Sequence, residues 1–236
     1  RRPSTMRQSP NTCGDCGKGD TTEVDMKPGK FITVEGIEGV GKSTNIAALV
    51  ESIEAAGHKV LTTREPGGTP FAEDIRDILM NRSDEPLPEV AELLMIFAAR
   101  SLNVNNVILP ALEAGTWVVC DRFTDSSRAY QGGGRGLPME TIDRLADWVH
   151  GDTWPDLTIL LDAPVDVGMA RAGTRSTPDR FEQERHDFFE RVRECYLQIA
   201  ANEPGRFVVI DTTRSIEEVR ADIAAIVERF LNEDLR

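Results

Sequence analysis

The chain has 236 residues, of which 40% are apolar and 28% are charged, and its formal net charge is −13. This length fits one α/β domain with a sizeable core. So acidic a chain is a poor candidate for general nucleic-acid binding, which depends on neutralising phosphates. No apolar run approaches the roughly 20 residues that a membrane helix needs, and residues 1–30 lack the apolar segment of a secretory signal peptide. We therefore predict a cytoplasmic protein that binds neither nucleic acid nor membranes.

Residues 1–29 differ in composition from the rest of the chain. They are rich in Ser, Thr, Gly, Pro and charge and show almost no apolar periodicity, so we interpret them as a disordered extension that precedes one domain at 30–236. Met26 is a candidate for the start of the folded unit. Cys13 and Cys16 form an isolated CGDC, and a zinc site needs about four ligands. An inert extension is therefore favoured over metal or redox chemistry.

From residue 31 onward, short apolar runs alternate with longer helical patterns. The runs that predict strands are 31–35, 59–63, 117–121, 157–162 and 206–211. The patterns that predict helices are 43–57, 70–80, 88–113, 139–150, 165–172, 181–202 and 215–232. The last of these opens with a capping box, Ser215 followed by Glu218. This alternation predicts a parallel sheet covered by helices on both faces, in which ligands gather at the carboxyl ends of the strands.

The first predicted strand runs into the sequence GIEGVGKST, whose first eight residues match GxxxxGK[ST] between a strand and a helix. Glycines let backbone N–H groups turn toward phosphate oxygens, and the helix N-terminus favours an anion. Lys42 would reach the β- and γ-phosphates, and the Ser43 hydroxyl would bind Mg²⁺. The alternative is a glycine-rich turn without a ligand. The predicted nucleoside triphosphate site consists of Gly36, Ile37, Glu38, Gly39, Val40, Gly41, Lys42, Ser43 and Thr44.

Several classes of protein share this loop, and the rest of the chain favours a small-molecule kinase. A GTPase would carry a guanine-reading NKxD motif, which this chain lacks, and motor ATPases are usually larger. A kinase needs a second phosphate site. Arg64, Arg100 and Arg122 follow or end predicted elements at the same sheet edge, and guanidinium groups bind phosphate through two hydrogen bonds. For Arg100 alone, a solvated helix face is an equal alternative.

Five segments resemble bacterial thymidylate kinases in sequence, order and spacing: EGIEGVGKST, TREPGGT, LLMIFAAR, DRFTDSSRAYQGGGRG and DRFEQE. The resemblance covers about residues 31–232. It implies the fold of a P-loop nucleoside monophosphate kinase, with a five-stranded parallel sheet, helices on both faces and a mobile lid. It also implies transfer of the γ-phosphoryl group of MgATP to dTMP, giving dTDP, and a homodimer that packs largely through helices.

The resemblance also implies roles for individual residues. Phe97 would stack on thymine, although plain core packing is the simpler interpretation from the sequence. Arg100 would hydrogen-bond the edge of the base, and Arg64 and Arg122 would lie near the dTMP phosphate. Glu38 would lie near the sugar 3′-hydroxyl. The implied dTMP site comprises Glu38, Arg64, Phe97, Arg100, Arg122, Ser126, Ser127, Tyr130 and Gln131.

The implied catalytic residues are Lys42, Asp121, Arg122, Arg171 and Arg175, and the implied Mg²⁺ ligands are Ser43 and Asp121. No general base is needed, because the acceptor oxygen is already ionised and catalysis consists of positioning and charge neutralisation. Gly132–Gly134 are interpreted as loop shape rather than as contacts. Asp211–Arg214 would supply backbone contacts to adenine.

The predicted lid covers about residues 171–180. Thymidylate kinases either have an arginine in the P-loop or have an arginine-bearing lid, and Gly39 in the P-loop places this chain with the second group. Arg175 is the favoured catalytic arginine, whereas Arg180 has the alternative role of anchoring the lid through a carboxylate. A kinase for another deoxynucleoside monophosphate and an ATP-binding switch without turnover are the competing functions.

Overall fold

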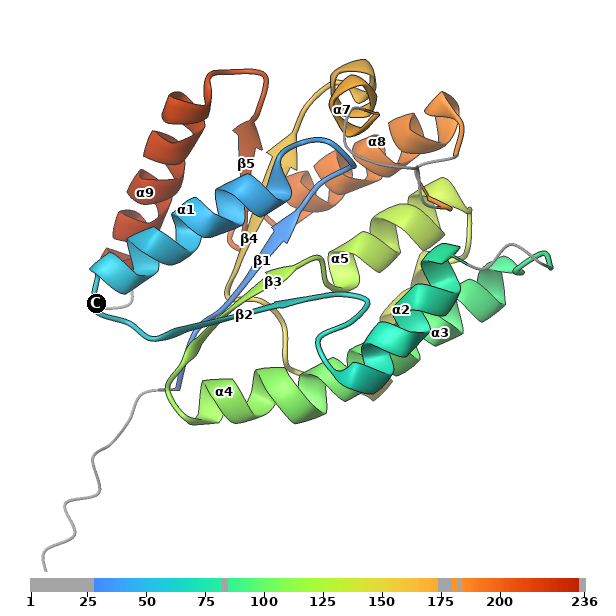
Figure 1. Ribbon diagram of the computed structural model, residues 1–236, viewed down its shortest axis with the longest axis horizontal. Coiled ribbons are helices and arrows are strands. Elements are labelled where there is room, and N and C mark those ends of the chain that lie inside the picture. The colour runs from blue at the N-terminus through green and yellow to red at the C-terminus, as the bar shows by residue number, and fades with distance from the viewer. Residues whose placement is uncertain (1–27, 82–84, 174–179, 182–183, 234–236) are drawn as a thin grey trace, which may run out of the picture.

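The computed structural model describes residues 28–81, 85–173, 180–181 and 184–233 (Figure 1). At its centre is a five-stranded sheet in the order β2-β3-β1-β4-β5, with parallel pairing throughout. The strands are β1 Phe31–Glu35, β2 Val60–Arg64, β3 Trp117–Asp121, β4 Leu157–Asp162 and β5 Phe207–Asp211. The predicted parallel sheet is confirmed, with strand ends shifted by one residue at most. Residues 1–27, which make up most of the predicted N-terminal extension and include its two cysteines, lie outside the described residues.

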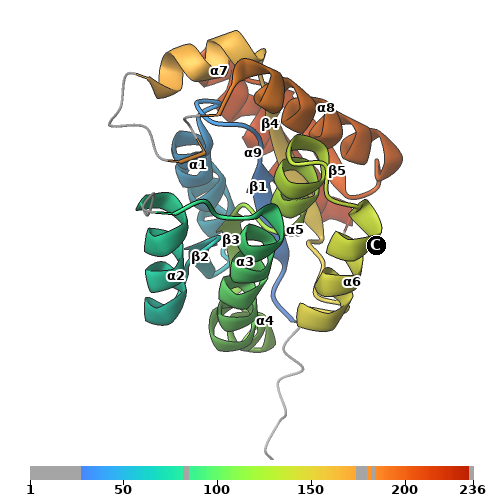
Figure 2. The ribbon, with the colours of Figure 1, turned by 90° about the vertical axis from the view of Figure 1, so that its right-hand side faces the viewer.

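Helices cover both faces of the sheet (Figures 1 and 2). On one face α1 packs against β1, β2, β3 and α9, and on the other α4 contacts β3 while α8 contacts β4 and β5. The longer helices are α1 Lys42–Ala55, α2 Pro70–Asn81, α3 Glu89–Asn103, α6 Met139–Val149, α7 Val165–Ala172, α8 His186–Asn202 and α9 Ile216–Glu233. The shorter ones are α4 Leu109–Glu113, α5 Thr124–Ser127 and the π-helices η1 Val104–Ile108 and η2 Arg128–Gly134.

Burial follows the position of each strand in the sheet. All five residues of β1 are buried, whereas the edge strands β2 and β5 are partly exposed. Buried parallel strands are normally continuous apolar runs. Yet β1 carries Thr33 and Glu35, both 0% exposed. A carboxylate at such a position requires partners, and these lie at the carboxyl edge of the sheet.

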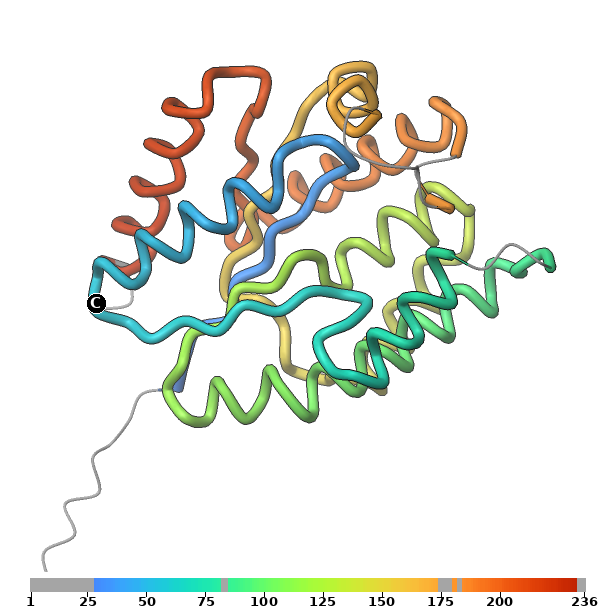
Figure 3. The backbone as a smooth tube through the Cα atoms, viewed as in Figure 1, coloured from blue at the N-terminus to red at the C-terminus, as the bar shows by residue number. Residues whose placement is uncertain are grey.

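The predicted helix 88–113 is one continuous path in the backbone tube, formed by α3, η1 and α4 (Figure 3). Its central segment is a π-helix that ends just before Pro110. Proline lacks an amide hydrogen and its ring clashes with the carbonyl four residues earlier, and a wider turn relieves both problems. By length and composition alone this stretch could cross a membrane, a test that core helices also pass, and 44% of its window is buried.

The glycine run at 132–134 differs from its prediction. The structure places it in the π-helix η2, packed against α8, rather than in a loop. A Cβ atom on Gly133 would lie 2.6 Å from the Cβ of Cys195. The glycines therefore permit two helices to approach closely. At the other end of the chain, the capping box is confirmed, because Ser215 N donates to Glu218 Oε2 at 3.0 Å and Glu218 N donates to Ser215 Oγ at 3.3 Å.

Replacing Gly133 with alanine tests this close approach. We expect Gly133→Ala to lower the free energy of unfolding by about 1–3 kcal/mol, because the new methyl group overpacks the contact between η2 and α8. Urea unfolding would measure it. Gly205→Ala is the matched control, since no atom lies within 4 Å of a Cβ there. An equal and small effect of both substitutions would contradict the close contact.

Candidate functional site

Two cavities lie at the carboxyl ends of the strands, one on each side of the loop that follows β1. The first has a volume of about 280 Å³ and is lined by this loop, by α3 and by residues that follow β2 and β3. The second, of about 230 Å³, is lined by the start of α1, by Arg171 and by the segment between β5 and α9. Gly39 and Gly41 line both cavities. The site can therefore hold two ligands that meet at one loop.

The loop between the cavities has the geometry of a phosphate-binding loop. Gly41 is the N-cap residue of α1, and Lys42 Nζ donates to the carbonyls of Gly36 at 3.1 Å and Ile37 at 2.8 Å. Burial, with the nearby Arg122 cation, lowers the pKa of Lys42 to about 8. Gly39 has φ +74°, and a Cβ there would lie 1.9 Å from the carbonyl oxygen of Gly168. Position 39 therefore has no room for a side chain.

Arg122 links the exits of β1 and β3. Its Nη2 donates to Glu38 Oε1 at 2.9 Å and to the hydroxyl of Tyr130 at 3.0 Å, and Tyr130 donates to Glu38 Oε2 at 2.7 Å. Its backbone has φ +69°, the only positive value at a non-glycine residue in the described part of the chain. Since left-handed backbone is strained for a side-chain-bearing residue, its surroundings must hold it in place. Glu38, Arg122 and Tyr130, all predicted site residues, are thus brought together.

Arg100 is a buried cation in the wall of the first cavity, 1% exposed. Its Nε donates to Glu65 Oε2 at 2.6 Å, and its Nη2 donates to the Phe123 carbonyl and to Ser127 Oγ, both at 3.1 Å. Its Nη1 is buried and has no hydrogen-bond partner among the described residues. Burial raises the pKa of Glu65, while Arg100 opposes that rise. The unpaired donor is therefore available to a ligand.

The structure corrects the position expected for Phe97. Its side chain is 2% exposed in a cluster with residues of α6 and does not line the cavity, whereas Ile96 does. Successive helical residues point about 100° apart, so only one of the two faces the ligand. The Arg100 guanidinium lies 4.4 Å from the centre of the Phe97 ring and occupies the flat face that was expected to receive the base. The family resemblance implied stacking by Phe97, whereas plain core packing was the simpler interpretation from the sequence.

Arg64 is also displaced from the predicted cluster. Its Nη2 pairs with Glu73 at 2.7 Å, its side chain is 54% exposed, and it does not line either cavity. Arg76, which was not among the predicted site residues, lines the first cavity and donates to the Pro66 carbonyl at 2.9 Å. An arginine within an amphipathic helix carries no local sign of a ligand.

Gln131 and Arg180 meet at one buried carboxylate that sequence analysis missed. Glu92, 1% exposed, accepts from Gln131 Nε2 at 2.8 Å and also pairs with Arg180 and Arg135. Arg180 donates in addition to the Leu79 carbonyl at 3.1 Å. These contacts match the alternative in which Arg180 anchors the predicted lid through a carboxylate.

Arg171, another predicted lid arginine, lines the second cavity and donates to the Thr212 carbonyl at 3.1 Å. Arg214 lines the same cavity. Arg175 lies outside the described residues.

Asp121 and Ser43 suit a divalent cation. Both line the first cavity, and Asp121 Oδ1 is buried without a hydrogen-bond partner in the described part of the chain. Mg²⁺ in nucleotide sites commonly uses one or two protein oxygens together with phosphates, and it keeps several waters. Among the described residues, no group of three or more His, Cys, Asp or Glu side chains could hold a metal ion.

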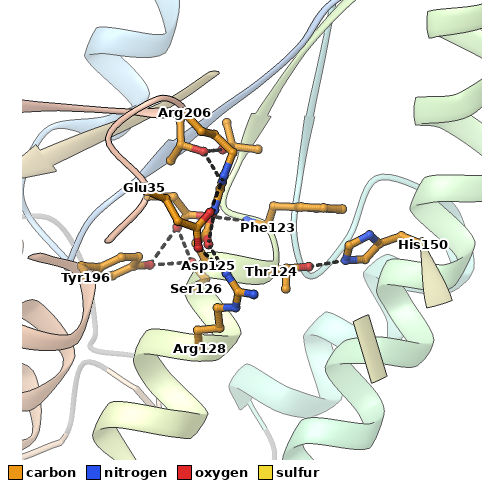
Figure 4. Close-up of polar contacts among 12 residues, drawn as sticks. Glu35, Phe123, Thr124, Asp125, Ser126, Arg128, His150, Tyr196 and Arg206 are labelled. Carbon is orange, nitrogen blue, oxygen red and sulfur yellow. Dashed lines mark hydrogen bonds and ion pairs between the residues drawn. The ribbon is translucent and has the colours of Figure 1, made fainter. Parts of the chain in front are cut away.

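Glu35 is the centre of a polar network (Figure 4), and two of its partners, Phe123 and Ser126, line the first cavity. Its Oε1 accepts from Phe123 N at 2.7 Å, and its Oε2 accepts from Ser126 Oγ at 2.6 Å and from the Tyr196 hydroxyl at 2.8 Å. Burial, followed by the negative charge of Asp125, raises its pKa from 4.5 to about 7. Sequence analysis missed this residue, although a carboxylate that ends a buried strand was a signal for it.

Comparisons with known proteins agree with one another. A family model described as thymidylate kinase matches residues 34–223. A thymidylate kinase of Methylococcus capsulatus is 56% identical over 206 residues, which cover 87% of this chain and 98% of the relative. One from Alcanivorax borkumensis is 52% identical, over 86% of this chain and 97% of the relative. The crystal structure of thymidylate kinase from Ehrlichia chaffeensis superposes with a TM-score of 0.67 and 33% identity, covering 85% of this chain and 99% of that one.

The raised pKa of Glu35 predicts how stability depends on pH. The folded state binds this proton more tightly than the unfolded state, so the free energy of unfolding falls as the pH rises from 4.5 to 7. Glu35→Gln removes this contribution. Relative to the variant, the native chain should therefore lose up to about 3 kcal/mol between pH 5 and pH 8. Urea unfolding of both proteins at each pH would measure it, and a difference that grows in the opposite direction would refute the assignment.

Proposed function

The chain belongs to the thymidylate kinase family and transfers the γ-phosphoryl group of ATP to dTMP, giving dTDP and ADP, and we propose that its two cavities divide this reaction between them. The first cavity takes dTMP and the second takes the adenosine part of ATP. The observation that carries this proposal is the phosphate-binding loop, whose Gly39 and Gly41 line both cavities. A loop shared in this way lets the γ-phosphate of one ligand face the phosphate of the other.

In the first cavity, Arg100 reads the base and Arg122 holds the phosphate. The buried, unpaired Nη1 of Arg100 supplies a donor for a thymine carbonyl, and Ile96 supplies an apolar wall beside it. Arg122 is the proposed phosphate ligand, because its guanidinium lines the cavity between the loop after β1 and η2 and contacts Glu38 and Tyr130 there. Glu38 and Tyr130 are proposed to lie against the sugar. Ser126, Ser127 and Gln131 line the same cavity and complete its polar surface.

On the ATP side, the backbone N–H groups of the loop and Lys42 bind the phosphates, while Ser43 and Asp121 hold Mg²⁺. When bound, Mg²⁺ neutralises charge on the β- and γ-phosphates. Arg171 and Arg214 line the second cavity, where they attract the negatively charged nucleotide. Arg175, favoured by the family resemblance, is proposed to neutralise charge on the group in transfer.

The chemistry then needs no protein base. The dTMP oxygen that attacks is ionised, so the protein lowers the barrier by alignment and by stabilising negative charge. Lys42 and Arg122 both donate to the Gly36 carbonyl of the loop, at 3.1 and 2.9 Å, and both line the first cavity. Their cations would stabilise the donor and the acceptor phosphate, respectively, and would repel neither as the two approach.

ADP production from MgATP tests the substrate assignment on the full chain. We expect rapid turnover with dTMP and only background with thymidine or with no acceptor, because the arginine site requires a phosphate. Turnover with dUMP should have a kcat/KM about 10–200-fold lower, the usual range for one missing methyl group in an apolar pocket. Removing Mg²⁺ with EDTA should abolish turnover. ADP release that does not depend on an acceptor would instead support the ATP-binding switch.

A homodimer is the second part of the proposal, and an exposed apolar face on α2 and α3 supports it. This face consists of Phe71, Ile78, Val90 and Leu94, which are 42–65% exposed. The two helices pack side by side and face the viewer in Figure 2. Exposed contiguous apolar surface on a soluble protein marks an interface. A second copy of the chain is the occupant that the family resemblance implies, and a cytoplasmic setting is proposed on the same ground.

Leu94→Glu tests this interface. Placing a charge at the centre of a buried apolar contact should convert the dimer to a monomer, because an unpaired buried charge costs several kcal/mol. Light scattering coupled to gel filtration would measure the mass. Val209→Glu is the control, since Val209 is 46% exposed on β5, away from the face on α2 and α3. A monomeric native chain, or a dimer that survives Leu94→Glu, would reject this face as the interface.

A further inference from the structure

Arg122 stands in a strained backbone conformation that two neighbouring residues of β1 hold from both sides. The amide of Arg122 itself donates to the Val34 carbonyl at 3.1 Å. The next amide, that of Phe123, donates to the Glu35 carboxylate at 2.7 Å. The peptide units before and after the left-handed residue are therefore both tied to β1. The carbonyl of the peptide unit that joins Arg122 to Phe123 also accepts from the Cys120 thiol at 3.0 Å. Glu35 therefore holds the amide end of a unit whose other end Cys120 holds.

The same carboxylate also reaches the far end of the Arg122 side chain. The Ser126 and Tyr196 hydroxyls both lie within hydrogen-bond distance of Glu35 Oε2, at 2.6 and 2.8 Å. Each of these hydroxyl oxygens also accepts from Arg122 Nη1 at 3.3 Å. When the hydroxyl hydrogens point to Glu35, the oxygen lone pairs are left to the guanidinium. Glu35 thus contacts the peptide unit after Arg122 directly and the guanidinium through two hydroxyls, while the Gly36 carbonyl and Glu38 accept from the same guanidinium, each at 2.9 Å. Figure 4 shows the contacts of Glu35 with Phe123, Ser126 and Tyr196.

We propose that Glu35 is a positioning residue for the transfer reaction, an acceptor-only group that sets the place of the Arg122 guanidinium for the acceptor phosphate. This inference rests on the role proposed above for Arg122. Glu35 contacts no ligand cavity itself, because it is 0% exposed and does not line either one. It acts only through Phe123, Ser126 and Tyr196.

An ionised carboxylate is the group that this position requires. All three partners of Glu35 are donors, one amide and two hydroxyls. Glutamine has nearly the same shape but presents one acceptor and one donor. In one orientation the glutamine NH₂ group would face the Phe123 amide, which is a donor. In the other orientation it would face the two hydroxyls and would turn a hydroxyl hydrogen toward the Arg122 cation. Glu35→Gln thus changes the hydrogen-bond directions while the volume of the core is retained.

Calorimetric binding of dTMP and of thymidine at pH 8 tests the proposal, with Glu35→Gln, Arg122→Met and the double variant. We expect Glu35→Gln to weaken dTMP binding about tenfold, as the loss of part of a charge-assisted contact would do. Thymidine, which lacks the phosphate, should change by less than about twofold. In the Arg122→Met background, Glu35→Gln should raise the Kd for dTMP by less than about twofold, because the guanidinium through which Glu35 acts is absent.

Other outcomes separate the two proposals. If Arg122→Met spares dTMP binding, then the phosphate role of Arg122 fails, and this inference fails with it. If Arg122→Met weakens dTMP alone but Glu35→Gln does not, only the inference about Glu35 is wrong. Equal losses for dTMP and thymidine, or a Glu35→Gln effect that persists in the Arg122→Met background, would also refute it, because general damage to the fold explains both.

Two further variants provide an independent test and a control. Tyr196→Phe removes one of the two hydroxyl intermediaries, and it should weaken dTMP binding but not thymidine binding even if Glu35→Gln does not fold. Thr33→Val is the matched control, since Thr33 is a buried polar residue of the same strand whose Oγ1 lies 2.9 Å from Thr158 Oγ1. It should leave the ratio of dTMP to thymidine affinity unchanged. A selective dTMP defect in Thr33→Val, or none in Tyr196→Phe, would count against the proposal.

Discussion

Burying a carboxylate is costly unless donors surround it, and four carboxylates lie almost completely buried beside the active cleft. Glu35, Glu65, Glu92 and Asp125 are each at most 2% exposed. Arginines pair directly with Glu65, Glu92 and Asp125. The local gathering of arginines in a chain of net charge −13 is therefore first a structural requirement. Arg100 does both, because it pairs with the buried Glu65 and also lines the first cavity.

Two arginines that line the first cavity, Arg100 and Arg122, each have a carboxylate partner. Arg100 turns its Nε to Glu65 and keeps Nη1 unpaired among the described residues. Arg122 pairs directly with Glu38 and also donates to two hydroxyls that contact Glu35. The first cation is held by one buried carboxylate, and the second by an ion pair together with hydrogen bonds to hydroxyls. Precise placement of charge before the substrate arrives is what phosphoryl transfer asks of a protein.

The sequence was sufficient for features that depend on local pattern. Strand positions, the phosphate-binding loop and the capping box at Ser215 follow from short-range spacing. Features that depend on which way a side chain turns were not accessible. Ile96 and Phe97 are adjacent and both apolar, and only packing against α6 decides that Phe97 turns inward. Glu35 needs partners from residues 123 to 196, which no local pattern brings together.

The close approach of Gly39 and Gly168 restricts how this protein can change over evolution. A Cβ at Gly39 would meet the Gly168 carbonyl at 1.9 Å, and one at Gly168 would meet the Glu38 carbonyl at 2.6 Å. A larger residue at either position requires the loop and α7 to move apart, whichever of the two glycines is replaced. Substitutions at the two glycines are therefore coupled. A homologue with a side chain at this loop position must also have α7 in a different position.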